Sequence, residues 1–512
     1  MENEMSNFYS MAFVLVLACG AQAQTNVTPM HVNLASRNKN TRELFQESMG
    51  WEEQFWDSRV KLIQNPTPGA DQGPSFHYMV RESSWYALGL LLRDGPGDRE
   101  RAAEILEVVL KEQYTSPGVR WYGTYKRTPE EPDPVSNSVM WRDYDPNWRE
   151  FIGTTFELIL VEYADKIPST LVQRLYAAID RSIEGEIAEK RLVPSYSNIA
   201  LMYGALWDFA ATYDKRADWK SQSAQWTESV YSLFKRFEAF DEFNSPTYYG
   251  VDLYGLALWR DYGSTTRIRF LGSTMEAALW NEIASFYQPS LRNISGPYDR
   301  SYGMDMGRYV AVTGVWMRSV LDAQIAPFPT ITASTDHLAD LWFAPHIAIL
   351  KTRIPPSALI KFKRFEGEHL VRKQITEDRV ATAWIGAHLI FGGEATNKTK
   401  DVGSTSQFHP ATVQWRTPSG EIGWVQLVQS PMINVIADKR GLTITATGTV
   451  RLRIHANNMA QSKIVQTSWE LPGLRVVVTS DAKNFNVERT GDTIDLVYVE
   501  MSKLRLDIST QK

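Results

Sequence analysis

The spacing of apolar residues changes once along this 512-residue chain, and that change sets the fold. Between about residues 40 and 325, apolar side chains recur with the period of an amphipathic helix, as in Ile152, Phe156 and Ile159. After Pro327-Phe328-Pro329 they alternate with polar residues, as in segment 450–454 (VRLRI), which is typical of strands. The chain is therefore predicted to begin with helices and to end with strands.

Many helical hairpins without a sequence repeat favour a closed (α/α) toroid over a regular solenoid. Short strands separated by turn sequences such as Thr417-Pro418-Ser419-Gly420 favour an antiparallel β-sandwich. We therefore predict a toroid over residues 24–335 and a β-sandwich over residues 336–512. A chain of this length can bury large cores without disulfides.

The N-terminus has the features of a secretory signal peptide. The apolar segment 11–18 (MAFVLVLA) is too short to span a bilayer, and the A-x-A sequence of residues 21–23 follows it. The preceding residues include Glu2 and Glu4 but no lysine or arginine, which departs from the usual pattern. Residues 1–23 are predicted to be removed, so we expect a secreted protein that is not held in a membrane. Three N-x-[ST] sequons are predicted glycosylation sites: Asn26, Asn293 and Asn397.

Composition excludes several functions. The net charge is −5 and the pI is about 6.0, so there is no basic excess with which to bind nucleic acid. The only cysteine, Cys19, lies in the predicted signal peptide, which excludes disulfides and thiolate metal sites from the mature chain. Aromatic residues make up 12% of the chain, which suits either large cores or a cleft that binds sugar rings. We expect a monomer.

Polar and aromatic residues gather in four segments between the predicted helices, which are residues 141–150, 194–198, 242–252 and 296–305. In a toroid of hairpins the loops at one end converge on a central cleft, so residues distant in sequence can meet there. The candidate substrate-binding residues in these segments are Trp148, Arg149, Asn198, Asn244 and Tyr298. For Asn198 taken alone, a cap of the following helix is the simpler explanation.

Arg300 lies between Tyr298 and Tyr302 in a glycine-flanked loop. These three residues could take part in catalysis. A guanidinium close to a phenol favours the phenolate and lowers its pKa, which would make the tyrosine a proton acceptor. The same guanidinium can hold a carboxylate through two parallel hydrogen bonds. Together these groups could remove a proton next to a carboxylate. The alternative is a structural Tyr–Arg cluster that closes a helical hairpin.

Glycoside hydrolysis is the competing chemistry, because it requires two opposed carboxylates. The same segments supply four candidate acids and bases: Asp145, Asp252, Asp299 and Asp305. Asp145 and Asp305 are equally explained as helix caps. His77, His337 and His346 lack the spacing of a transition-metal site, and no nucleotide-binding motif is present. We expect no cofactor and no such metal, while a structural Ca²⁺ held by loop carboxylates stays open.

The order of signal peptide, helical toroid and β-sandwich resembles the polysaccharide lyases of the chondroitin AC, hyaluronate, alginate and heparinase II/III type. The stretches DPNWREFIG, NSPTYYGVDLYGL and GPYDRSYGMDM resemble those of secreted fungal proteins. In the lyase group an Asn and an Arg bind the uronate carboxylate, while a Tyr with a His performs the elimination. The resemblance implies that Asn198, or alternatively Asn244, binds the carboxylate together with Arg300. It implies that Tyr248 or Tyr249 is the catalytic tyrosine.

The first hypothesis is a secreted lyase that cleaves a uronic-acid-containing polysaccharide or oligosaccharide by β-elimination. Tyr248, Tyr249 or Tyr302 would act as both base and acid, since no histidine lies between His77 and His337. The second hypothesis is a glycoside hydrolase of the helical-toroid type. The third is a small-molecule dehydratase or cyclase on the same scaffold, and the fourth is a carbohydrate-binding protein without activity.

Overall fold

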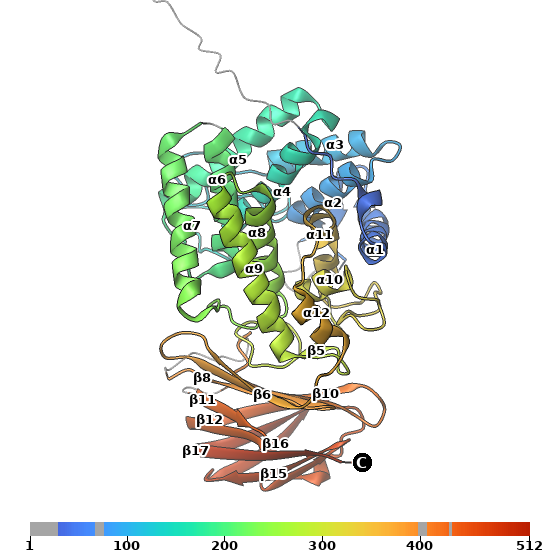
Figure 1. Cartoon of the computed structure of the whole chain (residues 1–512), viewed down its shortest axis with the longest axis vertical. Coiled ribbons are helices and arrows are strands. Elements are labelled where there is room, and N and C mark those ends of the chain that lie inside the picture. Colours follow the sequence, from blue (N-terminus) through green and yellow to red (C-terminus); the bar gives the residue numbers. More distant parts are fainter. Residues whose placement is uncertain (1–28, 67–75, 214, 398–406, 430–432, 512) are drawn as a thin grey trace, which may run out of the picture.

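The computed structural model describes residues 29–66, 76–213, 215–397, 407–429 and 433–511. The predicted signal peptide and the sequon at Asn26 lie outside these residues. The described part divides into an N-terminal helical region and a C-terminal strand region (Figure 1). Within the described ranges, no helix combines the length and the apolar character that crossing a bilayer requires.

The helical region has two layers. The inner layer consists of α2 (Val80–Arg93), α4 (Trp148–Tyr163), α6 (Ser197–Tyr213) and α8 (Tyr248–Tyr262). These helices are buried on almost every side, as expected for helices enclosed by others. The outer layer consists of α3 (Asp98–Lys111), α5 (Ser169–Glu189), α7 (Ala217–Phe237) and α9 (Thr266–Phe286). The outer helices keep polar residues exposed beside a buried apolar stripe.

The inner helices close into a ring. Each packs against the outer helix that follows it, and α2, α4, α6 and α8 contact one another in that order. The ring is completed by α11 (Ala344–Leu350), which contacts both α8 and α2. Beside it lie α1 (Lys39–Phe55) and α10 (Val312–Arg318), while α12 (Pro356–Lys363) packs against α9 (Figure 1). This closed arrangement of hairpins is what the predicted toroid requires.

Several short elements connect these helices. They are the 3-10 helices η1 (Leu34–Ser36), η2 (Ala164–Lys166) and η3 (Leu338–Phe343), and the strands β1 (Trp56–Asp57), β2 (Leu62–Gln64), β3 (Tyr78–Met79), β4 (Tyr287–Gln288) and β5 (Asn293–Ile294).

The strand region is one antiparallel sheet of 12 strands. Its strands are β6 (His369–Gln374), β7 (Val380–Ile385), β8 (Leu389–Ala395), β9 (Ala411–Arg416), β10 (Ile422–Gln429), β11 (Ile433–Asp438), β12 (Gly441–His455), β13 (Ile464–Val465), β14 (Ser468–Leu471), β15 (Leu474–Ser480), β16 (Asn484–Thr490) and β17 (Thr493–Thr510). The 3-10 helix η4 (Gln461–Lys463) precedes β13. The strand order is β13-β14-β15-β17-β12-β10-β9-β8-β7-β6, with β11 paired to β12 and β8, and β16 paired to β17.

Two long strands make this sheet continuous. One half of β12 pairs with β11 and the other half with β10, while β17 pairs with both halves. The prediction of antiparallel strands is confirmed, but the predicted sandwich of two separate sheets is not, because strands β6 to β17 share one hydrogen-bonded network. Alternation of apolar and polar residues assigns side chains to a face, and it contains no information about which strands pair.

The change from helix to strand also comes later than the predicted residue 335. Both α11 and α12 lie beyond that position, and the first strand of the large sheet begins at His369. These two helices have 7 and 8 residues and carry a proline in their first turn. They are too short to repeat the helical apolar spacing that identified the longer helices.

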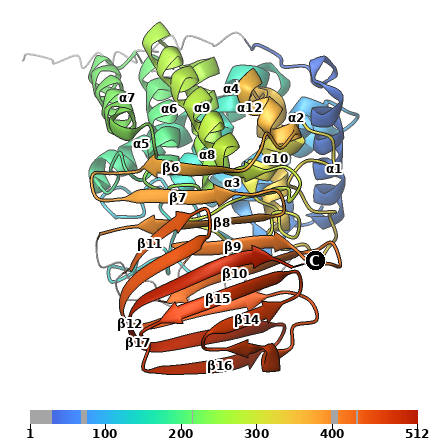
Figure 2. The same ribbon diagram turned by 60° about the horizontal axis from the view of Figure 1, so that its bottom comes forward.

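The sheet packs one of its faces against the helical region. Ala383 and Ile385 of β7 belong to the core of the helical region, whereas Phe391 of β8 belongs to a second core within the strand region. Figure 2 shows β6, β7 and β8 next to the helices and the later strands farther away. Tyr298 and His409 exchange two backbone hydrogen bonds of 3.0 and 2.8 Å, which attach a loop of the helical region to the strand region.

The two sequons within the described residues differ in their exposure to solvent. Asn293 in β5 is completely buried and donates from Nδ2 to the carbonyl of Met304 at 2.7 Å. A glycan needs an exposed amide, so the glycosylation prediction at Asn293 is wrong, because the motif carries no information about burial. Asn397 is exposed, and a glycan there stays a prediction.

Candidate active site

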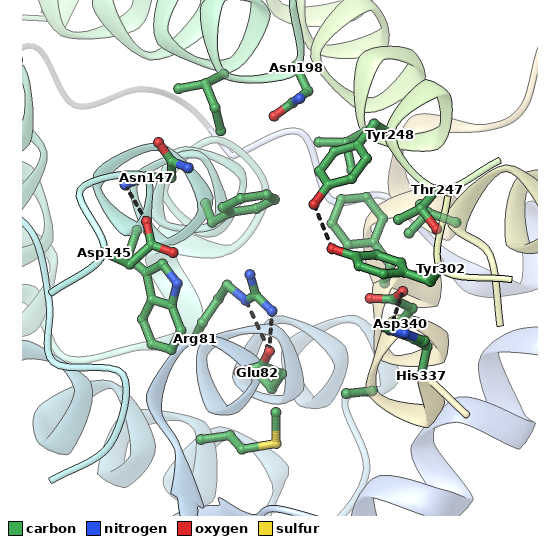
Figure 3. Close-up of a pocket in the computed structure, with 18 of the residues that line it drawn as sticks. Arg81, Glu82, Asp145, Asn147, Asn198, Thr247, Tyr248, Tyr302, His337 and Asp340 are labelled. Atoms are coloured by element: carbon green, nitrogen blue, oxygen red, sulfur yellow. Dashed lines mark hydrogen bonds and ion pairs between the residues drawn. The ribbon is translucent and has the colours of Figure 1, made fainter. Parts of the chain in front are cut away.

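A cavity of about 930 Å³ lies where the amino ends of the inner helices meet. The first or second residue of each inner helix lines it: Arg81 of α2, Trp148 of α4, Asn198 of α6 and Tyr248 of α8. Figure 3 shows Arg81, Asn198 and Tyr248 around the same space. The amino end of a helix carries a partial positive charge, because its backbone dipoles align. The fold thus directs four such ends toward one cavity, which favours an anionic ligand.

Arg300, Tyr248 and Tyr302 form a hydrogen-bonded chain in the cavity wall. Arg300 donates from Nη2 to the Tyr248 hydroxyl at 2.6 Å, and its Cζ lies 3.6 Å from the centroid of that ring. The hydroxyl oxygens of Tyr248 and Tyr302 lie 2.6 Å apart (Figure 3). Tyr302 is 40% exposed, so it presents the end of this chain to the cavity. The structure therefore brings together three predicted residues from two separate segments, 242–252 and 296–305.

Glu242 links Arg300 to Asn198. Arg300 donates from Nη1 to Oε1 of Glu242 at 2.8 Å, and Nδ2 of Asn198 donates to Oε2. Burial raises the pKa of Glu242, although the Arg300 guanidinium opposes that shift. The side-chain oxygen of Asn198 accepts no hydrogen bond from the described residues. Both predicted carboxylate-binding residues, Arg300 and Asn198, are thus held in place by an internal carboxylate.

An imidazole and an amide complete this wall. The ring of His337 stacks on Tyr302 with the centroids 4.1 Å apart, and its Nδ1 lies 3.9 Å from Oδ2 of Asp340. Gln407 of the strand region accepts a hydrogen bond from Nε of Arg300 at 3.0 Å. The site therefore contains a histidine, although none lies near Asn198 in sequence.

Burial dominates the ionisation of both tyrosines. Burial raises the pKa of Tyr248 well above its ordinary value of 10.0 and also raises the pKa of Tyr302, although Arg300 lowers both. The predicted lowering of the phenol pKa is therefore wrong for the ligand-free site. A guanidinium that already neutralises Glu242 does not offset the cost of a buried phenolate. At neutral pH both residues are hydrogen-bond donors.

The opposite wall carries a second arginine, Arg81, packed against three aromatic rings. Its Nε and Nη2 donate to Oε1 of Glu82 at 3.0 and 2.5 Å. Asp145 accepts a hydrogen bond from the backbone N–H of Asn147 at 2.9 Å, which fixes its carboxylate at the cavity. Asp145 and Asp340 both interact electrostatically with Arg81, and Figure 3 shows them on either side of it. The cavity thus holds carboxylates as well as guanidiniums.

Four predicted residues do not line this cavity. The hydroxyl of Tyr249 donates to Glu282 at 2.5 Å, within the protein core. Asn244 is buried and donates to two backbone carbonyls of the 295–297 loop. Tyr298 lies buried at the contact with the sheet, and Arg149 pairs with two glutamates of α5. The predicted site roles of these residues are wrong, and for Tyr249 the reason is that neighbouring residues of a helix point about 100° apart.

Of the four predicted carboxylates, Asp145 lines the cavity and the other three do not. Asp252 is completely buried in α8, where burial raises the pKa of its carboxyl well above the ordinary range. Asp299 binds Arg379 of the strand region, and Asp305 accepts a backbone hydrogen bond at 2.8 Å within its own loop. Their assignment as acids or bases for this cavity is wrong. Among the described residues no group of three His, Cys, Asp or Glu side chains is placed to hold a metal ion.

Sequence reasoning missed Arg81, Glu242 and Gln407, and it assigned His337 no role in the site. Glu242 is the first residue of the polar segment 242–252, so the gathering of polar residues in that segment could have identified it. Arg81 shares with Tyr248 a position at the amino end of an inner helix, which is the signal that could have found it. No local pattern identifies Gln407, because its contact with Arg300 depends on how the two regions pack.

The sequence matches two family descriptions. Residues 42–352 match the "Domain of unknown function (DUF8769)" and residues 367–493 match the "Domain of unknown function (DUF8770)". No curated protein matches the sequence.

Among solved structures, the chain is similar to heparinase III, with a TM-score of 0.45, 10% identity, and coverage of 95% of this chain and 88% of that chain. It is similar to the chondroitin AC lyase of Streptomyces coelicolor A3 in complex with chondroitin sulphate, with a TM-score of 0.41, 10% identity, and coverage of 91% and 79%. It is also similar to the endoglucanase CelQ of Clostridium thermocellum, with a TM-score of 0.25, 9% identity, and coverage of 92% and 93%. Scores and identities in this range do not establish a shared activity.

Proposed function

The chain belongs to the family described as Domain of unknown function (DUF8769), and for this member we propose a carbon–oxygen lyase that cleaves a uronic-acid-containing polysaccharide by β-elimination. One observation carries the proposal: the hydrogen-bonded chain from Arg300 through Tyr248 ends at the exposed Tyr302 in a large cavity. Elimination next to a carboxylate needs a cation or donor for that carboxylate and a proton-transfer group beside it. This chain supplies both within one connected network.

The substrate carboxylate would bind beside Arg300. The nitrogens Nη1 and Nη2 each use one N–H, for Glu242 and Tyr248, and each carries a second N–H for which the described residues provide no partner. The Asn198 amide and the amino ends of α6 and α8 adjoin the same position. Donors and partial positive charge at that point stabilise the carboxylate as negative charge develops on it, which lowers the barrier to proton removal.

Tyr302 would then move the proton. The C–H bond next to the carboxylate breaks, its electron pair forms a carbon–carbon double bond, and the bond to the leaving sugar oxygen breaks. Tyr302 in its phenolate form accepts the proton and returns it to the leaving oxygen, so the residue ends as it began. The hydrogen bond to Tyr248 lets Arg300 share the negative charge of the phenolate, and His337 holds the ring orientation through stacking.

A glycoside hydrolase of the helical-toroid type is the second candidate. The observation that favours it is the placement of Asp145 and Asp340 in the same cavity, both near Arg81. Two carboxylates that face one glycosidic bond are the requirement for hydrolysis. A small-molecule dehydratase or cyclase has less support, since a small, closed cavity would favour such an enzyme and this one is large.

The deciding experiment incubates the purified protein with a panel of polyuronides and follows the ultraviolet absorbance of the conjugated C4–C5 double bond. Elimination gives rising absorbance together with new chain ends, and the Tyr302→Phe variant should form both about 10²- to 10⁴-fold more slowly. New reducing ends without absorbance would contradict the lyase and favour the hydrolase, with Asp145→Asn and Asp340→Asn as the next variants. Binding of a polyuronide without either product would leave a carbohydrate-binding protein. Secretion, which the N-terminal segment predicts, is tested separately by the N-terminal sequence of the protein recovered from culture medium.

A further inference from the structure

We propose that Arg379, in the strand region, is a positioning residue that fixes Arg300 and Glu242 relative to one another. Testing this inference by enzyme activity rests on the proposed lyase function, whereas testing it by hydrogen exchange needs no substrate. Arg379 directly precedes β7, and its side chain is 13% exposed. It does not line the described part of the cavity, so the inference concerns the placement of other residues and not contact with a substrate.

Arg379 binds two separate loops of the helical region. Its Nη1 donates to the backbone carbonyl of Asp241 at 3.1 Å, and its Nη2 donates to Oδ2 of Asp299. The third nitrogen, Nε, donates to Glu394 of β8 at 2.8 Å, which anchors the guanidinium to the sheet. One planar side chain thus connects two loops and the sheet through three differently directed hydrogen bonds, which an ammonium group cannot reproduce.

The residues held by Arg379 directly precede the ion pair of the site. Asp241 comes before Glu242, and Asp299 comes before Arg300. The two loops are also joined to each other, because the backbone N–H of Phe243 donates to Oδ2 of Asp299 at 3.1 Å and the N–H of Asp299 donates to the Phe243 carbonyl at 3.0 Å. The separation between Glu242 and Arg300 is therefore set by contacts of Asp241, Phe243 and Asp299, which are their neighbours in sequence.

The strand region also holds the other side of Arg300. The backbone N–H of Ser301 donates to the carbonyl of Gln407 at 2.9 Å, and the side chain of Gln407 accepts from Nε of Arg300. Both sequence neighbours of Arg300 are therefore attached to the strand region, through Arg379 on one side and Gln407 on the other. Arg300 belongs to the helical region in sequence, but contacts with the strand region hold it in place against Tyr248.

Charge makes this link sensitive to substitution. The carboxylates of Asp299 and Glu394 are nearly or fully buried, and Arg379 forms an ion pair with each. Removing it takes a shared positive charge away from two buried carboxylates, which costs more than the loss of a surface pair. We expect the two loops to separate, and Arg300 to lose its stacked position on Tyr248.

The experiment compares Arg379→Gln and Arg379→Lys with a matched control, Arg416→Gln, in the full-length protein. Arg416 is also an arginine of the sheet that donates to a backbone carbonyl of the helical region, at Ser290, but it contacts neither loop. We expect Arg379→Gln to lower kcat about 10²-fold, the usual cost of misplacing a reacting group by an ångström. Arg379→Lys should recover part of that loss, and Arg416→Gln should retain kcat.

The pH dependence separates positioning from general damage. Burial raises the pKa of Tyr302, the proposed base, and Arg300 opposes that shift. If Arg379→Gln displaces Arg300, the phenol pKa rises further, and the part of the kcat profile that rises with pH moves to higher pH. A variant that is merely less stable would contain less active protein, but its kcat would rise over the same pH range as that of wild type. If kcat rises over the same pH range in wild type and Arg379→Gln, the inference is overturned.

Hydrogen exchange tests the same inference without any substrate. In Arg379→Gln the amides of residues 242–244 and 298–301 should exchange at least about tenfold faster, since the contacts that protect them are lost, while Arg416→Gln leaves them unchanged. Unchanged exchange in these segments would overturn the inference. If Arg379→Gln fails to fold, Asp299→Asn removes the same charged contact and must show the same local increase. Faster exchange in a protein whose wild type lacks lyase activity would uphold the positioning role and reject the proposed function.

Discussion

The guanidinium of Arg300 lies over the ring of Tyr248, 3.6 Å from its centroid, and donates to the hydroxyl of the same residue at 2.6 Å. Because Arg300 both stacks on Tyr248 and donates to its hydroxyl, it fixes the orientation of the ring and of the hydroxyl group. Only a planar group with several donors can make both contacts while also binding Glu242 and Gln407. The residue at position 300 must therefore carry a planar group with several hydrogen-bond donors.

We expect Arg300→Lys to lower kcat about 10²- to 10³-fold, because lysine keeps the charge but cannot reproduce the fork of donors. The loss should be visible in the rate of double-bond formation on whichever polyuronide is the substrate. Arg308→Lys is the matched control, since Arg308 follows in the same loop but is exposed and pairs with Glu421. Near-normal kcat in Arg300→Lys would mean that charge alone is required.

Tyr302→Phe and Tyr248→Phe should each lower kcat about 10²- to 10⁴-fold, the range for a lost proton-transfer group. Tyr249→Phe provides the comparison within the same helix, because the Tyr249 hydroxyl contacts Glu282 in the core and not the cavity. That variant should retain kcat. Equal losses for all three variants would indicate a structural effect, and the proton-transfer assignment would then be wrong.

The rate should rise with pH. Burial raises the pKa of Tyr248 and of Tyr302 above 10.0, so the phenolate is the minor form at neutral pH and increases about tenfold per pH unit below that pKa. Since the proposed base is the phenolate, kcat measured between about pH 7 and pH 9 should increase across the whole interval. A profile that falls in this interval would instead indicate a protonated carboxyl as the essential acid, as a hydrolase requires.

His346 should make stability fall in acid. The ring is completely buried, its Nε2 lies 3.0 Å from the Thr155 hydroxyl, and burial lowers its pKa from 6.5 to about 3. The unfolded chain therefore binds a proton that the folded protein excludes, so this contribution is complete above the unfolded pKa of 6.5 and is lost as pH falls below it. Near pH 5 the loss is about 2 kcal/mol.

The test for this contribution compares the free energy of unfolding in denaturant for wild type and His346→Phe, each near pH 5 and near pH 7. Other groups, such as His409, contribute to the acid loss of both proteins. Only the part due to His346 differs, so the variant should lose less stability than wild type between the two pH values. Identical losses would show that the ring is not held neutral in the folded protein.

The sequence by itself determined the order of the two regions and located part of the site. The helical spacing of residues such as Ile152 and Phe156 is a local property, so it predicted helices without knowledge of their partners. Arg300 and Tyr302 were found in the same way, because a polar, glycine-flanked segment between helices must form a loop. The family resemblance assigned roles to Asn198 and Tyr248, and both line the cavity.

Tertiary structure alone decided which of these residues meet. Tyr248 and Tyr249 are adjacent in sequence, and the rotation of α8 within the ring determines that the first faces the cavity and the second faces Glu282. Arg300 meets Glu242 across 58 positions and Gln407 across 107 positions of sequence. Contacts over such separations depend on how the ring closes and how the sheet docks on it, and no local pattern of apolar or polar residues records either event.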